Sequence, residues 1–211
     1  MNSLLKGAVA SGLLLGLTGI AQANLIVNGS FEENALARGS WSVFNAIDGW
    51  STVWGPGIEI QNNVTGPAFD GMQFVELDSH ANSAMAQTVG TAVGQTYLLE
   101  FAYSPRPGVD SYSNLIDVFW NGVSLTDNAG ITANGASTTL WSLLNFNVVG
   151  TGNDILTFAA LGKSDAVGGF LDGVSLTAAA SPPAPVPEPA ALLLFGTGLV
   201  GLSGWIRRMR T

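Results

Sequence analysis

A period of two in the apolar residues is the feature that most restricts how this chain can fold. In the stretch MQFVELD at residues 72–78, Val75 and Leu77 fall on one face of an extended chain. Glu76 and Asp78 fall on the opposite face. A helix would instead need apolar residues three and four positions apart, and the central part of the chain shows no convincing pattern of that kind. The alternation therefore predicts β-strands.

Further strands and their turns can be read along the same region. Strands are expected at residues 96–103, 115–125, 143–150, 154–161 and 169–177. Asn121-Gly122 interrupts one of these runs and favours a two-residue hairpin, because both central positions of a type I′ turn need positive φ. Glycine, asparagine, aspartate and serine crowd the intervals between the runs. Short strands at regular spacing predict an all-β domain, an antiparallel β-sandwich of the jelly-roll kind, over residues 24–178.

The first 23 residues have the organisation of a secretory signal peptide. One lysine precedes an apolar stretch that runs to Ile20, and small residues follow at Ala21 and Ala23. A basic start, an apolar core and an A-x-A pattern are typical of a signal peptide that is removed on export. An uncleaved membrane anchor is the alternative, but the apolar stretch is short and interrupted by glycine. The mature chain is expected to begin at Asn24.

The C-terminus carries a second apolar segment with different flanks. Residues 190–206 contain no charge, a proline-rich stretch at 179–189 precedes them, and residues 207–211 include three arginines. A segment of this length is near the minimum, about 17 residues, for a helix that spans a bilayer. The arginines would stay in the cytoplasm and leave the rest of the chain outside. A buried core helix would explain neither the linker nor the arginines, so residues 190–206 are predicted to form a transmembrane helix.

The same C-terminal residues resemble a known sorting signal. Pro187, Glu188 and Pro189, the apolar segment and a basic end with Arg207 and Arg208 stand in the order of the PEP-CTERM signal of Gram-negative bacteria. Proteins with that signal are exported and handled by an exosortase that is thought to cut near Pro-Glu-Pro. The resemblance implies an exported protein of the cell surface or extracellular matrix, anchored in the membrane only transiently.

Charge and cysteine content exclude several functions for the mature domain. Residues 24–178 hold fourteen of the fifteen acidic residues and only three basic ones, Arg38, Arg106 and Lys163, a net charge of −11. Such a surface repels phosphate groups, so neither nucleic acid nor anionic lipid is an expected partner. The chain has no cysteine, which excludes disulfides, thiolate catalysis and cysteine-bound zinc. Stability must come from an apolar core, with or without a bound hard cation.

Four motifs in the domain carry a second resemblance. They stand in the order NLIVNGSFEE, DGW, GPAFDGMQFVELD and GGFLDGVSL, and together they span nearly all of residues 24–178. This order resembles the galactose-binding-like jelly rolls of carbohydrate-binding modules, in particular the branch shared with plant cell-wall proteins and bacterial choice-of-anchor proteins. The resemblance implies a β-sandwich, often calcium-stabilised, that associates with polysaccharide and usually has no catalytic activity.

The resemblance also implies a calcium site where the first and last strands run close together. In such domains the glutamate of Asn-Gly-x-Phe-Glu shares a cation with an aspartate of the final strand, which points here to Glu32 and Asp172. Backbone carbonyls near Asn28, together with Asp70, would fill the remaining positions. Calcium takes about 6–8 oxygen ligands, and an acid-rich domain without cysteine offers them. The alternative is that Glu32 and Asp172 are solvated turn residues.

Exposed aromatic rings are candidates for sugar binding, because rings stack on the CH surfaces of sugars while amides and carboxylates bind hydroxyls. An aromatic-rich stretch contains Trp41 and Trp50 and is followed by Glu59 and Gln61, with Trp50 expected in the core. Trp54 stands beside glycine and proline in an expected loop, and two tyrosines bracket a second loop. The predicted ligand-binding residues are Trp54, Tyr103 and Tyr112.

Catalytic signatures are weak in this domain. It has a single histidine, His80, and the chain has no Gly-x-Ser-x-Gly elbow, so a Ser-His-Asp triad is not supported. Glu76 and Asp78 share a strand face and could be the paired acids of a glycosidase, although acids are frequent here. The expected function is an exported, non-catalytic β-sandwich that binds polysaccharide. A glycoside hydrolase and a purely structural matrix protein are the alternatives.

Overall fold

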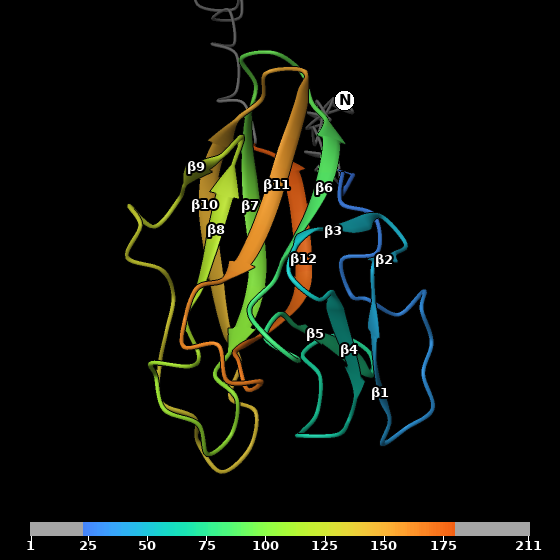
Figure 1. Ribbon diagram of the computed structural model, residues 1–211. Helices are drawn as coiled ribbons and strands as arrows, with labels where there is room; N and C mark the ends of the chain where they lie inside the picture. Colours follow the sequence, from blue (N-terminus) through green and yellow to red (C-terminus); the bar gives the residue numbers. More distant parts are fainter. Residues whose placement is uncertain (1–22, 180–211) are drawn as a thin grey trace, which may run out of the picture. The chain divides into compact units, whose positions relative to one another are not determined.

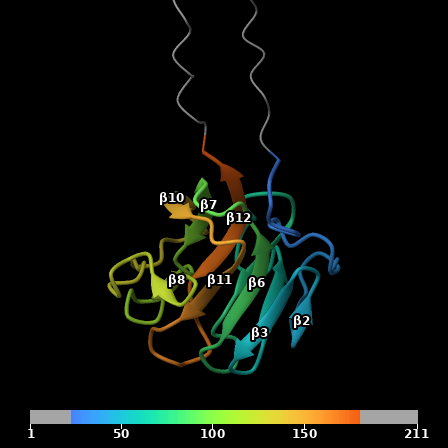
Figure 2. The same cartoon turned by 90° about the horizontal axis from the view of Figure 1, so that it is seen from above.

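The computed structural model describes residues 23–179, which form two six-stranded antiparallel sheets (Figure 1). The first sheet has the order β1-β4-β5-β12-β7-β10 and the second the order β2-β3-β6-β11-β8-β9. Figure 2 shows the two sheets as layers, with β8, β11, β6, β3 and β2 in one and β10, β7 and β12 in the other. The predicted all-β sandwich is confirmed for the described residues.

The strands have the following bounds in sequence order. They are β1 Trp41–Phe44, β2 Ala46–Ile47, β3 Trp50–Trp54, β4 Ile58–Asn62, β5 Gln73–Glu76, β6 Ala84–Gly90, β7 Thr96–Ser104, β8 Ile116–Trp120, β9 Val123–Ser124, β10 Ser142–Val149, β11 Asn153–Ala160 and β12 Phe170–Ala178. The alternation therefore located seven of these strands correctly, and the one run expected at residues 115–125 contains both β8 and β9. The strands β1 to β4 and β6 were not predicted.

The predicted Asn-Gly hairpin joins β8 to β9. Asn121 has φ 52° and Gly122 has φ 78°, as a type I′ turn requires. Residues 1–22 of the predicted signal peptide and the whole predicted transmembrane helix lie outside the described residues. Within residues 23–179, no helix has the length and apolar character needed to cross a membrane.

The core lies between the inner faces of the two sheets. Phe158 of β11 is at its centre, with ring centroids 6.0 Å from Trp50 and 4.9 Å from Phe101. Trp50 is 1% exposed, which confirms its predicted place in the core. The buried apolar residues of this core run from Ile26 to Leu176, so a fragment of residues 24–180 keeps every one of them.

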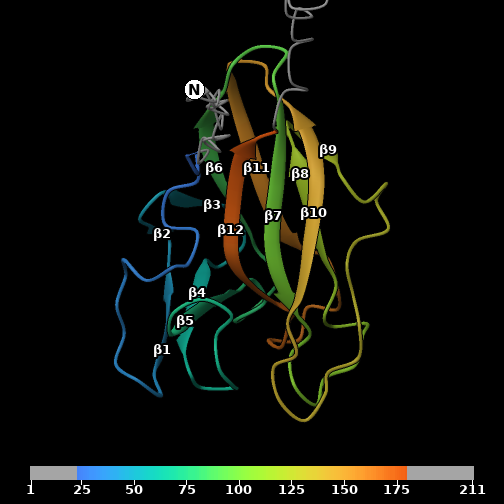
Figure 3. The same ribbon diagram turned by 180° about the vertical axis from the view of Figure 1, so that it is seen from behind.

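The direction of β12 separates the two ends of the sandwich. At its start, Phe170 pairs with Glu76 of β5. At its end, the N–H of Ala179 donates to the carbonyl of Thr96, and the N–H of Leu25 donates to the carbonyl of Leu176. The first and last described residues therefore lie together at one end of β12, and the middle of β4 and β5 lies near the other (Figure 3).

Candidate functional site

Acidic side chains meet on the outer face of the first sheet, where β4 and β5 lie side by side. Residues directly opposite each other on neighbouring strands point to the same face. Ile60 pairs with Val75, and both belong to the core. One position away along each strand, Glu59 pairs with Glu76. Both carboxylates therefore lie on the outer face, opposite to the core.

Gln61 and Trp41 extend this row to β1. Gln61 lies two positions after Glu59 on the same face of β4, and Trp41 is its partner on β1. The side-chain nitrogen Nε2 of Gln61 donates to Glu59 Oε1 at 2.9 Å and to Glu76 Oε2 at 2.7 Å. One amide group thus bridges two buried carboxylates, which fixes the positions of both.

Two loops complete the hydrogen bonds of Glu76. Arg106, in the loop after β7, forms an ion pair and a hydrogen bond with Glu76 Oε2. Its guanidinium carbon lies 5.8 Å from the centre of the Phe170 ring. The N–H of Gly168, in the loop before β12, donates to Glu76 Oε1 at 2.7 Å. Glu76 is fully buried, so these loops cover the outer face of the sheet at this point.

Burial controls the ionisation of the two glutamates. Burial raises the pKa of Glu76 to about 8, even though the Arg106 charge lowers it. Burial also raises the pKa of Glu59, against the hydrogen bond from Gln61 and the charges of Arg106 and His80. One guanidinium faces two buried carboxylates, so neutralising the second requires a proton. We infer that the pair holds one proton at neutral pH.

Trp41 and His80 form the exposed part of this site. Trp41 is 51% exposed, and its ring meets the imidazole of His80 edge-on, with centroids 6.2 Å apart. His80 belongs to the loop between β5 and β6 and is itself exposed. An open indole ring can stack on the CH surface of a sugar, and the exposed imidazole beside it can bind a hydroxyl, whereas Glu59, Gln61 and Glu76 are buried beneath them. We call Trp41, Glu59, Gln61, Glu76, His80 and Arg106 the Trp41 site.

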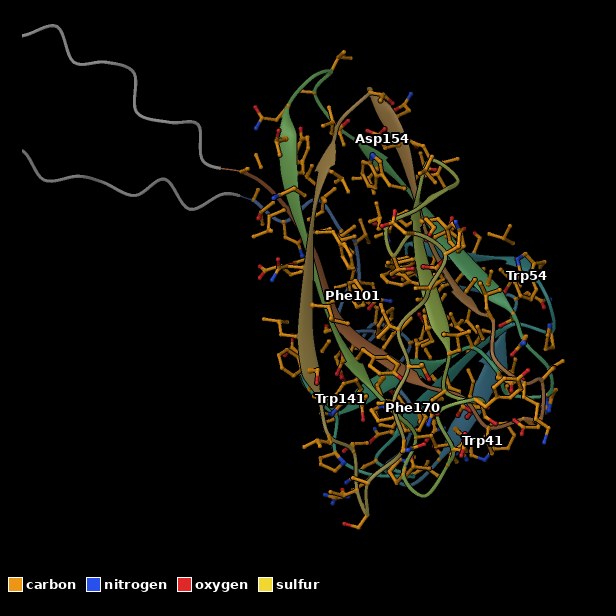
Figure 4. All side chains as sticks on the ribbon, turned by 90° about the vertical axis from the view of Figure 1, so that its left-hand side faces the viewer. Trp41, Trp54, Phe101, Trp141, Asp154 and Phe170 are labelled. Atoms are coloured by element: carbon orange, nitrogen blue, oxygen red, sulfur yellow. The ribbon has the colours of Figure 1, made fainter. Side chains whose placement is uncertain are left out.

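The predicted ligand residue Trp54 is exposed but lies on the other sheet. It stands at the end of β3, opposite Ala84 of β6, and is 43% exposed. Figure 4 shows Trp54 and Trp41 as separate positions along one side of the domain. The prediction that Trp54 stands in a loop is corrected, because the strand extends through it. Its ring remains available to a ligand.

The two predicted tyrosines have different surroundings. Tyr112 is 75% exposed and lines a cavity of about 290 Å³ with Leu115, Leu161 and Lys163. Tyr103 is only 3% exposed, and its hydroxyl donates to the carbonyl of Asn114. Burial raises the pKa of Tyr103 to about 12. The ligand-binding prediction for Tyr103 is therefore corrected, because a buried ring offers no face to a sugar.

The predicted calcium ligands Glu32 and Asp172 hold the loop between β4 and β5 from two sides. Glu32 Oε1 accepts the N–H groups of residues 72–73, each at 2.7 Å. Asp172 Oδ2 accepts the N–H groups of residues 69–70 at 2.8 and 2.9 Å. Asp172 is fully buried, and burial raises its pKa to about 7 despite these bonds. Both carboxylates thus bind backbone donors.

The region fits a calcium ion only in part. Asn28 and Asp70, the other two predicted ligands, line a polar cavity of about 340 Å³ together with Glu33. Oxygen atoms of the kind that calcium prefers are therefore present. However, no group of three acidic or histidine side chains within residues 23–179 is placed to hold a metal. The calcium site stays a prediction.

Most residues of the Trp41 site were not predicted from the sequence. Trp41 was recognised only as part of an aromatic-rich stretch, and Glu59 and Gln61 only as polar residues that follow it. Glu76 was named as a possible glycosidase acid, but together with Asp78 and not with Glu59. A usable signal was the alternation in IEIQN, where Glu59 and Gln61 share a face opposite two isoleucines. The sorting residues Ala21, Pro187, Glu188, Pro189, Arg207 and Arg208 lie outside the described residues. Ala23 is the first described residue and is exposed.

Comparison with known proteins identifies the C-terminal segment. Residues 185–208 match the PEP-CTERM protein-sorting motif, which confirms the resemblance drawn from Pro187-Glu188-Pro189. The motif marks an exported, sorted protein of the cell envelope. No curated protein matches the chain.

Solved structures share the fold at low sequence identity. A Stig cyclase from Fischerella sp. TAU, solved in complex with (3Z)-3-(1-methyl-2-pyrrolidinylidene)-3H-indole, is 14% identical and covers 77% of this chain and 100% of its own, with a TM-score of 0.55. A family 35 carbohydrate-binding module from Clostridium thermocellum is 14% identical and covers 66% of this chain and 99% of its own, with a TM-score of 0.44. TmCBM61 in complex with β-1,4-galactotriose is 19% identical and covers 74% and 99%, with a TM-score of 0.45. The Stig cyclase likeness supports the sandwich fold, and none of the three transfers a ligand or an activity.

Proposed function

We propose that this protein is exported to the surface or extracellular matrix of a Gram-negative bacterium, where its sandwich binds polysaccharide at the Trp41 site without cleaving it. One observation carries the proposal. The half-exposed ring of Trp41 lies next to His80 and beside a row of hydrogen-bonded carboxylate and amide groups on β4. The indole ring offers a stacking surface and the exposed imidazole of His80 a hydrogen-bond partner, while the carboxylate and amide row lies buried beneath them.

The route to the envelope follows from the sorting motif. An exosortase-type enzyme would process the chain near Pro187-Glu188-Pro189 after residues 190–206 had held it transiently in the membrane. The chain leaves the sandwich at the end of β12, whereas Glu76 pairs with the start of that strand. Nine residues of strand correspond to about 30 Å. The Trp41 site would therefore stay accessible at the end away from the point of attachment.

Replacing Trp41 with alanine should weaken polysaccharide binding by the fragment of residues 24–180. The loss of one stacking ring is expected to weaken binding by about tenfold or more, since 1.4 kcal/mol corresponds to a factor of ten. The measurement is retention on insoluble polysaccharides and glycan arrays. Trp54→Ala is the matched control, because Trp54 is similarly exposed on the other sheet. Binding that survives Trp41→Ala but not Trp54→Ala would assign the binding site to Trp54. A fragment that retains no glycan would favour a purely structural protein.

A glycoside hydrolase is the second candidate, and the buried acid pair favours it. Glu76, with a pKa of about 8, could donate a proton while Glu59 acts as the base. The full burial of Glu76 beneath Arg106 argues for a structural role instead. The assay is the release of reducing ends from any glycan that the fragment retains. Turnover that disappears in Glu76→Gln, while binding persists, would replace the binding proposal with hydrolysis.

Calcium is a further component of the proposal, placed at Glu32, Asp172, Asn28 and Asp70. The support is the polar cavity beside Asn28 and Asp70 and the resemblance of the terminal motifs. Ion binding to the folded state alone would raise the free energy of unfolding by about 2.7 kcal/mol at a hundredfold excess over Kd. The melting temperature of the fragment should therefore be higher in millimolar calcium than in EGTA. A shift that is absent, or that survives combined Glu32→Gln and Asp172→Asn, would remove the site.

A further inference from the structure

The free edge of β10 differs from the other sheet edges of the described sandwich. The edge strands β1, β2 and β9 have four, two and two residues. β10 has eight residues and pairs with β7 along its whole length, which leaves its other side open at the border of the first sheet (Figure 3). Proteins usually shorten, charge or cover such edges, because unpaired N–H and C=O groups pair readily with another strand. A long open edge therefore indicates a partner.

The backbone of β10 shows which residues face that open side. The N–H of Gly150 donates to the carbonyl of Gln95, so Gly150 and every second residue before it turn toward β7. On the far side of β7, the N–H of Ala179 donates to the carbonyl of Thr96, which gives the same alternation independently. The residues between are Leu143, Asn145, Asn147 and Val149, and their N–H and C=O groups point away from β7. The carbonyl of Val149 also accepts from Trp120 Nε1 at 3.0 Å, so this end of the edge is partly covered.

The sequence of β10 is symmetric about its centre. Around Phe146 it reads Leu-Leu-Asn, then Phe, then Asn-Val-Val, with no charge and no proline. An antiparallel copy of the strand centred on Phe146 would place asparagine opposite asparagine. It would also place Leu143 opposite Val149, which are 55% and 54% exposed in the single chain. Each side chain would meet one of its own chemical class, as a self-complementary interface requires.

We propose that two copies of this protein associate through β10, in antiparallel register about a two-fold axis at Phe146. Asn145 of one copy would exchange both backbone hydrogen bonds with Asn147 of the other. These are residues whose N–H and C=O groups already face outward, so the intramolecular ladder with β7 stays intact. The two first sheets then become one continuous sheet of twelve strands. Where Leu143 of one copy meets Val149 of the other, the Val149 carbonyl would have to accept from Leu143 as well as from Trp120.

This dimer would be bivalent if the Trp41 site binds polysaccharide, a consequence that rests on the proposed function. β1 and β10 are the opposite edges of the first sheet, so pairing through β10 leaves the two Trp41 sites at the far ends of the joined sheet. Two sites held this far apart can engage different polysaccharide chains, or distant parts of one. The protein would then cross-link the matrix as well as bind it.

Sedimentation equilibrium of the fragment of residues 24–180 over a concentration series tests the proposal. The unchanged fragment should show twice the mass of one chain. Asn145→Lys with Asn147→Lys puts like charges opposite each other and should give a monomer, although it lowers the net negative charge of each copy. Asn145→Lys with Asn147→Asp puts opposite charges in register and should remain a dimer. Both pairs of substitutions are on an exposed face, so melting curves should show that each variant folds.

A mixture of two variants sharpens the result. Asn145→Asp with Asn147→Asp should be monomeric alone and should form a heterodimer when mixed with the double lysine variant. A double lysine variant that dimerises as well as the unchanged fragment would overturn the proposal. So would an unchanged fragment that stays monomeric, which would leave the edge to an extended segment of another protein. Either result is independent of glycan binding by Trp41.

Discussion

The melting temperature of the fragment of residues 24–180 should fall steadily as the pH rises from about 5 to about 8.5. Glu76 has a pKa of about 8 in the folded chain, against 4.5 when exposed, and Asp172 has about 7, against 3.8. Burial raises both values. Between the two pKa values of each group, the folded chain keeps a proton that the unfolded chain has lost.

The sign of the effect follows from these protons. Because the folded state binds more protons in this window, each such group lowers the free energy of unfolding by about 1.4 kcal/mol per pH unit. The stabilisation is complete below about pH 4 and is lost as the pH passes through the folded pKa values. Hydrogen bonds act oppositely at Asp154: burial raises its pKa, but bonds from Asn121, Thr151 and Thr91 bring it to about 2. Its contribution disappears only in stronger acid, so maximal stability is expected near pH 4 to 5.

Glu76→Gln is the control for this pH dependence. Glutamine keeps the shape of the acid and cannot titrate, but its single oxygen can accept from Arg106 or from Gly168 and not from both. A uniform loss of stability at every pH is therefore expected, and the control is read from the slope alone. In the variant, the free energy of unfolding should fall less steeply with pH, by the contribution of about one proton. The part of the pH dependence that is due to Asp172 should remain. The measurement is urea unfolding at a series of pH values. A flat profile for the unchanged fragment between pH 5 and 8 would contradict the shared-proton description of the Trp41 site.

Phe158→Ala should destabilise the fragment by about 3–5 kcal/mol. The ring is fully buried between Trp50 and Phe101, so its removal leaves a cavity and breaks two aromatic contacts. Each aromatic pair contributes about 0.5–1.5 kcal/mol beyond the area buried. In a domain of this size the expected loss is about 10 °C in melting temperature. The midpoint and slope of urea unfolding measure the change directly.

Phe119→Ala is the matched control on the neighbouring strand. Phe119, on β8, pairs with Thr157 of β11. Its side chain lies on the outer face of the second sheet and is only half-buried. The same substitution there should cost about 1 kcal/mol, because little apolar area is removed from a packed interior. Equal losses of stability at Phe158 and Phe119 would contradict the strand register, which places Phe158 on the inner face and Phe119 on the outer face.

Local features of the sequence allowed much of the fold to be predicted. The alternation around Val75 and Leu77 put both on the inner face, where they are buried. The Asn121-Gly122 turn was readable because few residue pairs accept positive φ at both positions. The same alternation could have placed Tyr103 correctly, since it shares parity with Leu99 and Phe101 of the core. The error came from weighing Tyr103 by the loop that follows it and not by its place in the strand expected at residues 96–103.

The Trp41 site was not predictable in the same way. Alternation assigns Glu76 to the face away from the core, and a face away from the core was expected to meet water. Instead, loops that begin some thirty and ninety positions later cover it with Arg106 and Gly168. Their positions depend on β12 lying between β5 and β7, an order that no local pattern specifies.

The sequence by itself determined the strand type, the turns, the cysteine-free acidic character and the C-terminal sorting motif. These depend on side-chain periodicity, on backbone angles of single residues and on composition, which are all local. Only the tertiary structure decided that Glu59 and Glu76 meet over one amide, that Trp41 stands beside His80, and that β10 ends the sheet with an open edge. Each of these depends on which strands become neighbours and in what register, and that choice is made by the packing of the whole core.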